Sequence, residues 1–247
     1  MIVTVLIALL GWVAGALVNY LADVLPLRRK LSAPFCLRCE EQLNFFNYLL
    51  WPRRCPSCGK NRGWRSWVVE LTAISVALWL WATPTTRLGF FPGLLLLIYF
   101  GVVVVIDIEY RLILHPVSLV GGLLGFIYGV RLHGISMTLL GGAVGFGMML
   151  LLYFGGTVFM RILAKRRGQE LDEEALGFGD VNLSGILGLL LGWPGIIAGL
   201  TLTILFGGAV SLIFLLLAII RKRYRAFTAI PYGPFLIAGA FFLLYLR

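Results

Sequence analysis

The sequence predicts an all-α protein that crosses a membrane about eight times and carries one polar insertion. Of its 247 residues, 60% are hydrophobic and only 13% are charged, and the mean hydropathy is +0.95. A soluble domain of this size could not bury so much apolar surface. Lys and Arg outnumber Asp and Glu by 21 to 11, an excess that sets orientation in a membrane protein and requires no nucleic acid.

Apolar runs of membrane-spanning length recur along the chain, separated by polar or charged segments. They predict eight spans, at roughly 2–22, 67–83, 90–106, 113–130, 135–160, 181–194, 196–220 and 230–246. The sixth run is short and is interrupted at Trp193-Pro194-Gly195, which predicts a tilted or broken helix.

The distribution of the cations predicts the orientation. If the N-terminus lies outside, 18 of the 21 Lys and Arg residues fall in inner segments, and only Arg87, Arg131 and Arg247 lie outside. Such an asymmetry is typical of cytoplasmic loops. It predicts an even number of spans, with both termini outside.

The first span ends in Gly15-Ala16-Leu17-Val18-Asn19-Tyr20. Asn19 is a polar side chain near the inner end of an apolar helix. We expect it to form a hydrogen bond between helices rather than to act in catalysis.

The segment 23–66 is the one long polar insertion, and it contains two Cys-x-x-Cys pairs fifteen residues apart. The pairs are Cys36 with Cys39 and Cys55 with Cys58. This spacing is typical of a closed, structural zinc site with four thiolates. Two disulfides are the alternative, but the orientation places this loop in the reducing cytosol, where disulfides are rare. Gly59 directly after Cys58 suits a tight knuckle turn.

Aromatic residues are interleaved with the cysteines. We expect them to pack around the metal or to lie on the membrane surface; they are Phe35, Phe45, Phe46, Tyr48 and Trp51. A basic loop beside anionic lipid needs no nucleic acid to explain it.

Asp107 follows the apolar end of the third span, Val102–Ile106, at the predicted inner face. Glu109 and Arg111 beyond it are interpreted as ordinary interfacial charges. His115, just before Pro116, is more easily interpreted as an interfacial polar residue than as a base.

Glycines recur at four-residue spacing in the fourth and fifth spans, which predicts close packing between helices. They are Gly121, Gly125, Gly129, Gly141 and Gly145. The loop that follows is basic and then acidic, and its acidic run is expected to be a solvated face; the run comprises Glu170, Asp172, Glu173 and Glu174.

Asp180 stands where the next apolar run begins, and no other charge follows until Arg221. An ionisable side chain at the edge of a span is a candidate functional residue, although Asp is also a favoured helix N-cap. Gly177 and Gly179 precede it and would let the backbone approach a partner element closely.

Asp107 and Asp180 are thus two carboxylates at one membrane depth on the same side. Two adjacent carboxylates share a proton, because both do not ionise easily. The ionised one can accept a proton from water while the other donates one to a peptide carbonyl. Spacing alone does not bring them together, since they lie on different spans.

Several segments carry motifs, in the following order. They are Gly15-Ala-Leu-Val-Asn19; the two Cys pairs with Glu70 after them; Ile106-Asp107; Glu174-Ala-Leu-Gly-Phe-Gly-Asp180-Val-Asn-Leu; and Ile230-Pro-Tyr-Gly-Pro-Phe235. In this combination the chain resembles the bacterial type IV prepilin peptidases, the leader peptidase/N-methyltransferases of the GxGD aspartic protease class. It departs from that pattern at Ala16, at Leu114-His115-Pro116 and at Asn182.

The resemblance implies an aspartic endopeptidase of the bacterial cytoplasmic (inner) membrane, with Asp107 and Asp180 catalytic at the cytosolic face. It would cut the leaders of prepilins and pseudopilins, in pilus assembly or protein secretion, and N-methylate the new N-terminus with S-adenosylmethionine. The expected parts are a first helix (1–22), a zinc-binding loop associated with methyl transfer (23–66) and a peptidase core (67–247). No glycine-rich fingerprint marks a cofactor pocket.

Three alternatives remain at this point. The closest is a peptidase that lacks the methyltransferase activity. A transporter would use carboxylates at the membrane midplane and broken helices, whereas both aspartates here lie at the inner edge. A zinc-ribbon adaptor in the membrane would not need Asp107 or Asp180.

Overall fold

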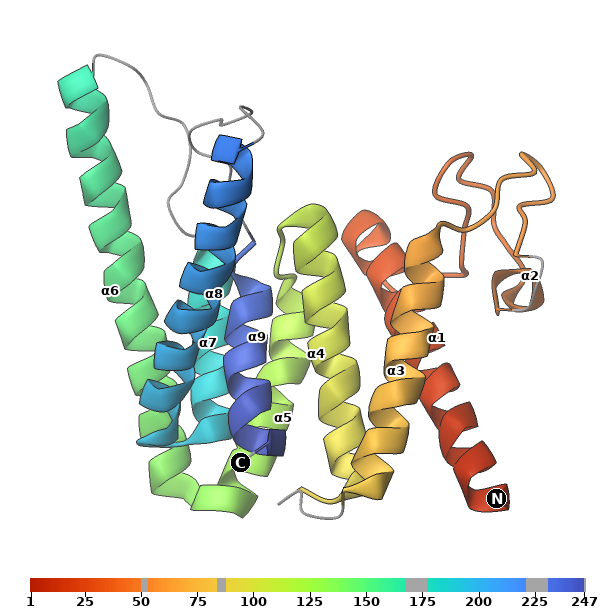
Figure 1. Cartoon of the computed structure of the whole chain (residues 1–247), viewed down its shortest axis with the longest axis horizontal. Helices are drawn as coiled ribbons and strands as arrows, with labels where there is room; N and C mark the ends of the chain where they lie inside the picture. Colours follow the sequence, from red (N-terminus) through yellow and green to blue (C-terminus); the bar gives the residue numbers. More distant parts are fainter. Residues whose placement is uncertain (50–52, 84–87, 168–176, 221–230, 247) are drawn as a thin grey trace. The chain divides into compact units, whose positions relative to one another are not determined.

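The described part of the chain is helical, as predicted. The structure is a computed structural model, and it describes residues 1–49, 53–83, 88–167, 177–220 and 231–246. Isolated β-bridges join Phe35 to Gln42 and Arg54 to Asn61 in the polar loop. The chain divides into two compact units, Met1–Leu112 and Ile113–Arg247, and each is considered by itself (Figure 1).

Unit 1 is built on three long helices: α1 (Ile2–Arg28), α3 (Trp64–Ala82) and α4 (Phe90–Tyr110). The polar loop and the short helix α2 (Phe45–Leu49) connect α1 to α3. Glycines let α1 and α3 pack closely: a Cβ on Gly11 would lie 2.7 Å from the Cα of Ile74, and one on Gly15 would lie 2.7 Å from the Cα of Glu70. The first helix therefore extends beyond the predicted end at residue 22 and delivers Asp23 to the loop.

Unit 2 contains α5 (His115–His133), α6 (Ile135–Arg167), α7 (Phe178–Leu191), α8 (Gly195–Ile220) and α9 (Gly233–Phe241), which continues into a π-helical turn, η1 (Phe242–Leu246). Helix α7 packs against each of the other four α-helices of the unit. Its apolar side chains, including Val181, Leu183 and Leu187, are almost completely buried.

The predicted glycine packing is confirmed around α7. A Cβ on Gly125 or Gly129 of α5 would meet the carbonyl oxygens of Ile186 and Leu189, and one on Gly141 or Gly145 of α6 would meet those of Gly188 and Ser184. The Ser184 hydroxyl also donates a 3.0 Å hydrogen bond to the Gly145 carbonyl. Helices approach this closely only where side chains are absent.

Five helices in the described residues are long and apolar enough to cross a membrane: α1, α4, α5, the stretch Ile135–Ile162 of α6, and Gly195–Leu217 of α8. The expectation of eight spans is only partly met. Helix α3 falls at the second predicted span, but it carries Arg65 and Glu70 and is not among the five. Helix α7 and the stretch Gly233–Leu246 are apolar but shorter.

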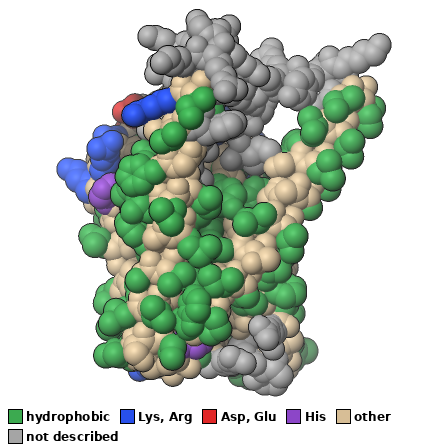
Figure 2. Space-filling view, turned by 90° about the vertical axis from the view of Figure 1, so that its left-hand side faces the viewer, with side chains coloured by type: hydrophobic (Ala, Val, Ile, Leu, Met, Phe, Trp, Pro, Cys, Tyr) green, Lys and Arg blue, Asp and Glu red, His purple; other side chains and the backbone are tan. Residues whose placement is uncertain are grey.

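The interruption predicted in the sixth run is confirmed. Helix α7 ends at Leu191, Gly192 adopts a positive φ of 63°, and α8 begins at Gly195. The Trp193 amide donates to the Met137 carbonyl at 3.0 Å, which ties this turn to the start of α6. Hydrophobic side chains cover most of the face formed by α6 and α8 (Figure 2), as expected for a surface in lipid.

Candidate functional site

Asp107 lies in the last turn of α4 and is buried, with 5% of its surface exposed. The helix ends directly after it: Arg111 adopts a left-handed conformation (φ 53°), and its amide donates to the Asp107 carbonyl at 2.9 Å. The prediction that this carboxylate stands at the end of an apolar helix is confirmed. A buried carboxylate without a functional role is uncommon in such a place.

Asp180 lies in the first turn of α7 and is also buried, with 9% exposed. The N-cap interpretation of Asp180 is wrong: the N-cap residue is Gly177, and its carbonyl accepts from the Asp180 amide at 3.1 Å. The carboxylate therefore sits inside the helix, where the positive end of the helix dipole stabilises negative charge.

The glycines before Asp180 do what the sequence predicted. A Cβ on Gly179 would lie 2.9 Å from the Cβ of Ile113, so the backbone there approaches the segment before α5 closely. Phe178 contacts Tyr153 of α6 edge-to-face, with 5.9 Å between the ring centroids. Tyr232, the residue before α9, lies within electrostatic range of the Asp180 carboxylate.

Asp107 belongs to unit 1 and Asp180 to unit 2. Their pairing therefore stays a prediction. His115, the first residue of α5, is exposed, in keeping with its interpretation as an interfacial residue.

The four cysteines converge as predicted. Their sulfur atoms all lie within 4.8 Å of one another. Cys36 and Cys58 are 3.6 Å apart and Cys39 and Cys55 are 3.5 Å apart, and all four are free thiols. Four thiolates held tetrahedrally at the usual zinc–sulfur distance would be roughly 3.8 Å apart, so the donor set fits a structural zinc ion and not two disulfides.

The two Cys pairs form matching knuckles. In the first, the Glu40 amide donates to the Cys36 carbonyl at 2.9 Å; in the second, the Gly59 amide donates to the Cys55 carbonyl at 2.8 Å. Both turns need a positive φ, 58° at Glu40 and 67° at Gly59. The tight turn predicted at Gly59 is confirmed, and Glu40 adopts the same conformation without being a glycine.

Backbone amides in the knuckles favour ionised thiols. Hydrogen bonds from the Cys58 and Ser57 amides lower the pKa of Cys55 to about 6. Burial raises the pKa of Cys36, but hydrogen bonds from the Cys39 and Arg38 amides outweigh it, and the net shift is downward. Such lowered thiol pKa values are typical of metal ligands.

A buried carboxylate that the sequence analysis did not select, Asp23, joins the loop to the helices of unit 1. Its Oδ2 accepts hydrogen bonds from the Tyr48 hydroxyl (2.6 Å) and from Arg62 (2.7 Å). Its Oδ1 pairs with Arg65, which also donates to Glu109 of α4 at 2.6 Å. Burial, and then the Asp23 carboxylate, raise the pKa of Tyr48, so the phenol stays a donor.

Glu70 of α3 is the centre of a second buried network. It accepts hydrogen bonds from Trp12 (3.1 Å), Asn19 (3.3 Å) and Arg53 (2.8 Å). Asn19 also donates to the Ser66 carbonyl at 3.0 Å. The expectation of an interhelical hydrogen bond from Asn19 is confirmed, and its partner is the carboxylate that the motif comparison singled out.

The aromatic residues of the loop divide. Phe35 and Tyr48 are buried beside the knuckles, whereas Phe45 and Phe46 are exposed. Glu109, expected to be an ordinary interfacial charge, is instead paired with Arg65. Outside the described residues lie Trp51, the acidic run from Glu170 to Glu174, the cations Arg221, Lys222, Arg223 and Arg225, and Ile230.

Comparison with known proteins agrees with the resemblance. A prepilin leader peptidase/N-methyltransferase from Aeromonas salmonicida is 27% identical over 217 residues, covering 85% of this chain and 70% of that protein. A protein of the same name from Bacillus subtilis is 26% identical over 220 residues, covering 85% and 78%. No solved structure matches the chain.

The match to a protein family covers both candidate catalytic residues. Residues 94–212 fit the type IV leader peptidase family, and this range contains the end of α4, all of α5, α6 and α7, and most of α8. The motif at residues 177–180 and the carboxylate at the end of α4 both fall within it. The chain therefore carries a type IV leader peptidase family domain over residues 94–212.

Proposed function

We propose that this protein is a prepilin peptidase that cuts the leader from type IV prepilins or pseudopilins and N-methylates the new N-terminus. The observation that carries the proposal is the pair of buried aspartates, Asp107 at the end of α4 and Asp180 at the start of α7. Both fall in the part of the chain that matches the leader peptidase family.

Helix order supports a common membrane side for the two carboxylates. Between the end of α4 and the start of α7 the chain contains α5 and α6, both long and apolar enough to cross a membrane. Two crossings return the chain to the side that it left. Asp107 and Asp180 are then available to one substrate at one membrane face.

The proposed chemistry is acid–base hydrolysis by the two carboxylates. When two carboxyl groups share one proton, the ionised group accepts a proton from the attacking water, and the protonated group donates to the scissile peptide carbonyl. Substrate cleavage then needs no covalent intermediate. Burial of both groups at helix ends excludes bulk water and keeps the shared proton in place.

The proposed orientation has both termini outside and the active site at the cytoplasmic face of the inner membrane, with α3, α7 and the C-terminal helix completing eight crossings. The cation distribution supports it, because residues 23–66 alone contain nine Lys and Arg residues. These charges also suit contact with an anionic lipid surface. No nucleic-acid partner is proposed.

The proposed division of the chain is a first helix (1–22), a zinc-binding loop (23–66) and a peptidase core (67–247). Cys36, Cys39, Cys55 and Cys58 would hold the zinc ion, which would be structural because four protein ligands leave no open position. The methyl donor would be S-adenosylmethionine. The alternative is a peptidase without methyltransferase activity; the transporter and adaptor alternatives do not account for the match over residues 94–212.

The test is cleavage of a purified prepilin by the full-length protein in lipid nanodiscs. Asp107→Asn and Asp180→Asn each keep the side-chain shape but remove the proton acceptor, and each is expected to lower the cleavage rate by at least about 10²–10⁴-fold. Glu109→Gln, two residues beyond Asp107, is the matched control and should cleave nearly normally. Wild-type cleavage by either aspartate variant would refute the pair.

A further inference from the structure

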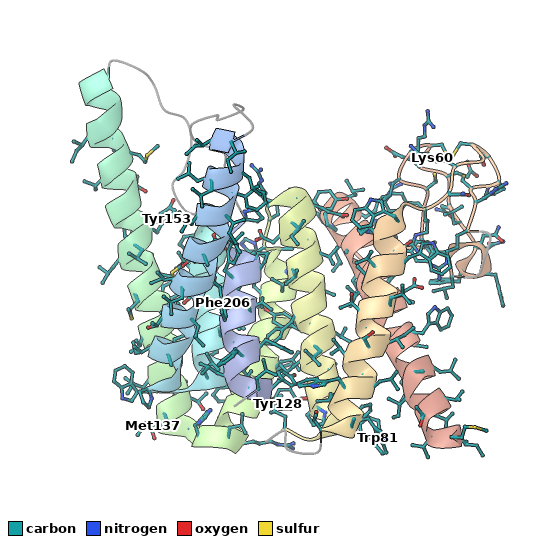
Figure 3. All side chains as sticks on the ribbon, viewed as in Figure 1. Lys60, Trp81, Tyr128, Met137, Tyr153 and Phe206 are labelled. Carbon is teal, nitrogen blue, oxygen red and sulfur yellow. The ribbon has the colours of Figure 1, made fainter. Side chains whose placement is uncertain are left out.

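Unit 1 contains a cavity of about 400 Å³ between the end of α1, α2 and the two knuckles. Pockets for cofactors and other small molecules start at about this size, whereas a single inorganic anion would leave most of it empty. Lys60, on the polar loop beyond the helices, is one of its lining residues (Figure 3).

The side chains around the cavity are mostly cationic. Arg38, Arg53, Lys60 and Arg62 line it, and Asp23 is the carboxylate among its lining residues. Asp23 is already engaged, because Arg62, Arg65 and Tyr48 all bond to it. The cavity is therefore suited to a ligand that brings its own negative group.

Arg53 has a hydrogen-bond donor to spare. It is 6% exposed, its Nη2 donates to Glu70 at 2.8 Å, and its Nε donates to the Leu49 carbonyl at 2.8 Å. Its Nη1 is buried and has no hydrogen-bond partner among the residues that the structure describes. A buried charged donor left without an acceptor is costly, and a carboxylate in the cavity would satisfy it.

The rest of the wall is suited to a larger, less polar body. Phe35 and Leu43 are buried and line the cavity together with Leu37. Cys36 and Cys55 line it too, and four thiolates around one Zn²⁺ carry a net charge of about −2, which offsets the cations on that side. The cavity thus combines a carboxylate-binding arginine, an apolar wall and a region able to tolerate positive charge.

We propose that this cavity binds S-adenosylmethionine, with the amino-acid carboxylate of the cofactor on Arg53. The inference rests on the proposed methyl transfer and assigns its cofactor to residues of the loop. It also gives the zinc site a purpose, because the knuckles that hold the metal form two sides of the cavity.

The test measures binding of S-adenosylhomocysteine to the full-length protein in nanodiscs of zwitterionic lipid, by isothermal titration. Arg53→Lys keeps the charge opposite Glu70 but loses the planar fork that serves two acceptors at once. Arg38→Gln/Lys60→Gln removes two exposed cations of the lining and does not touch the buried networks. Arg29→Gln/Lys30→Gln removes the same two residue types outside the lining and is the control.

We expect Arg53→Lys and Arg38→Gln/Lys60→Gln each to weaken binding by at least about tenfold, with the control unchanged and the zinc content the same in all proteins. Binding of 5′-methylthioadenosine, which lacks the carboxylate, should be weaker in the wild type and insensitive to Arg53→Lys. That insensitivity would not follow from a general loss of folding.

Two results overturn the cavity but leave the proposed function standing. One is equal S-adenosylhomocysteine affinity in the wild type, Arg53→Lys and Arg38→Gln/Lys60→Gln in protein that methylates pilin. The other is a change only in association with vesicles containing anionic lipid, which would make the cavity a headgroup site. Absence of both cofactor binding and methylation, with prepilin cleavage intact, would refute the methyltransferase activity and the cavity together.

Discussion

At the scale of single residues, the Arg53–Glu70 pair is the most demanding interaction in unit 1. The two charged groups are 2.8 Å apart, with 5% and 3% of their side chains exposed. Trp12 and Asn19 add neutral donors to the same carboxylate, and Arg53 also lies over the Trp67 ring, 4.6 Å from its centroid. The pair joins α1, α3 and the zinc loop at one point.

Glu70→Ala is expected to destabilise the protein by about 3–5 kcal/mol, because it leaves the buried Arg53 guanidinium without its counter-charge. Thermal unfolding in detergent measures the loss. The exposed pair between Arg28 and Glu40, 3.8 Å apart, supplies the contrast: Glu40→Gln should change stability by no more than about 0.5 kcal/mol. Equal effects of the two changes would mean that the buried network contributes nothing special.

Sequence reasoning found the residues that announce themselves locally. Asp107 and Asp180 interrupt apolar runs, and the cysteines have a recognisable spacing. It did not select Asp23, because the partners of Asp23 come 25 to 42 residues later, from Tyr48, Arg62 and Arg65. Nothing in the local pattern around residue 23 distinguishes an interfacial carboxylate from one buried by a distant loop.

At the scale of elements, α7 shows why apolar runs did not translate directly into spans. Its 14 residues extend for about 21 Å at 1.5 Å per residue, less than the roughly 30 Å of a bilayer core. The helix is enclosed by other helices of unit 2 rather than by lipid. Its start at Phe178, three residues before the predicted position, follows from Gly177 serving as N-cap.

The glycine contacts around α7 can be tested on α5 alone. A Cβ at Gly129 would lie 2.0 Å from the Leu189 carbonyl oxygen, whereas one at Gly122 would meet nothing within 4 Å. Gly129→Ala should therefore destabilise the protein by about 1–3 kcal/mol, because the two helices must move apart. Gly122→Ala should be neutral or stabilise by up to about 1 kcal/mol. The same unfolding measurement compares them, and a tolerated Gly129→Ala would contradict the close approach of α5 and α7.

The knuckles make a prediction about metal content. Purified protein should contain about one zinc ion per chain, since four thiolates complete the coordination. Elemental analysis checks this, and Ser57→Ala in the second knuckle, which removes no ligand, should keep the metal. Metal-free protein with its thiols blocked in disulfides would contradict both the zinc site and the cytosolic location of the loop.

At the scale of the whole molecule, the two units suggest a separation of the two activities. Unit 1 holds the zinc knuckles, the cavity and Asp107, and unit 2 holds Asp180. Peptide hydrolysis needs the two carboxylates and a groove for the leader. Methyl transfer needs the freed amine held beside a cofactor, and the polar loop offers the described cavity with the size and charge for it.

Cys→Ser changes at position 36, 39, 55 or 58 should therefore lower methylation more than cleavage. Much of the folding free energy of such a loop comes from the metal, so these variants lose the walls of the cavity, while helix packing against Gly11, Gly15 and the α7 contacts holds the rest. Conversely, Asp107→Asn and Asp180→Asn should still methylate a pre-cleaved pilin. Mass spectrometry of the pilin N-terminus reads both reactions, with Ser57→Ala as control. Stably inserted Cys variants that methylate pre-cleaved pilin at the wild-type rate would show that the loop takes no part in methyl transfer.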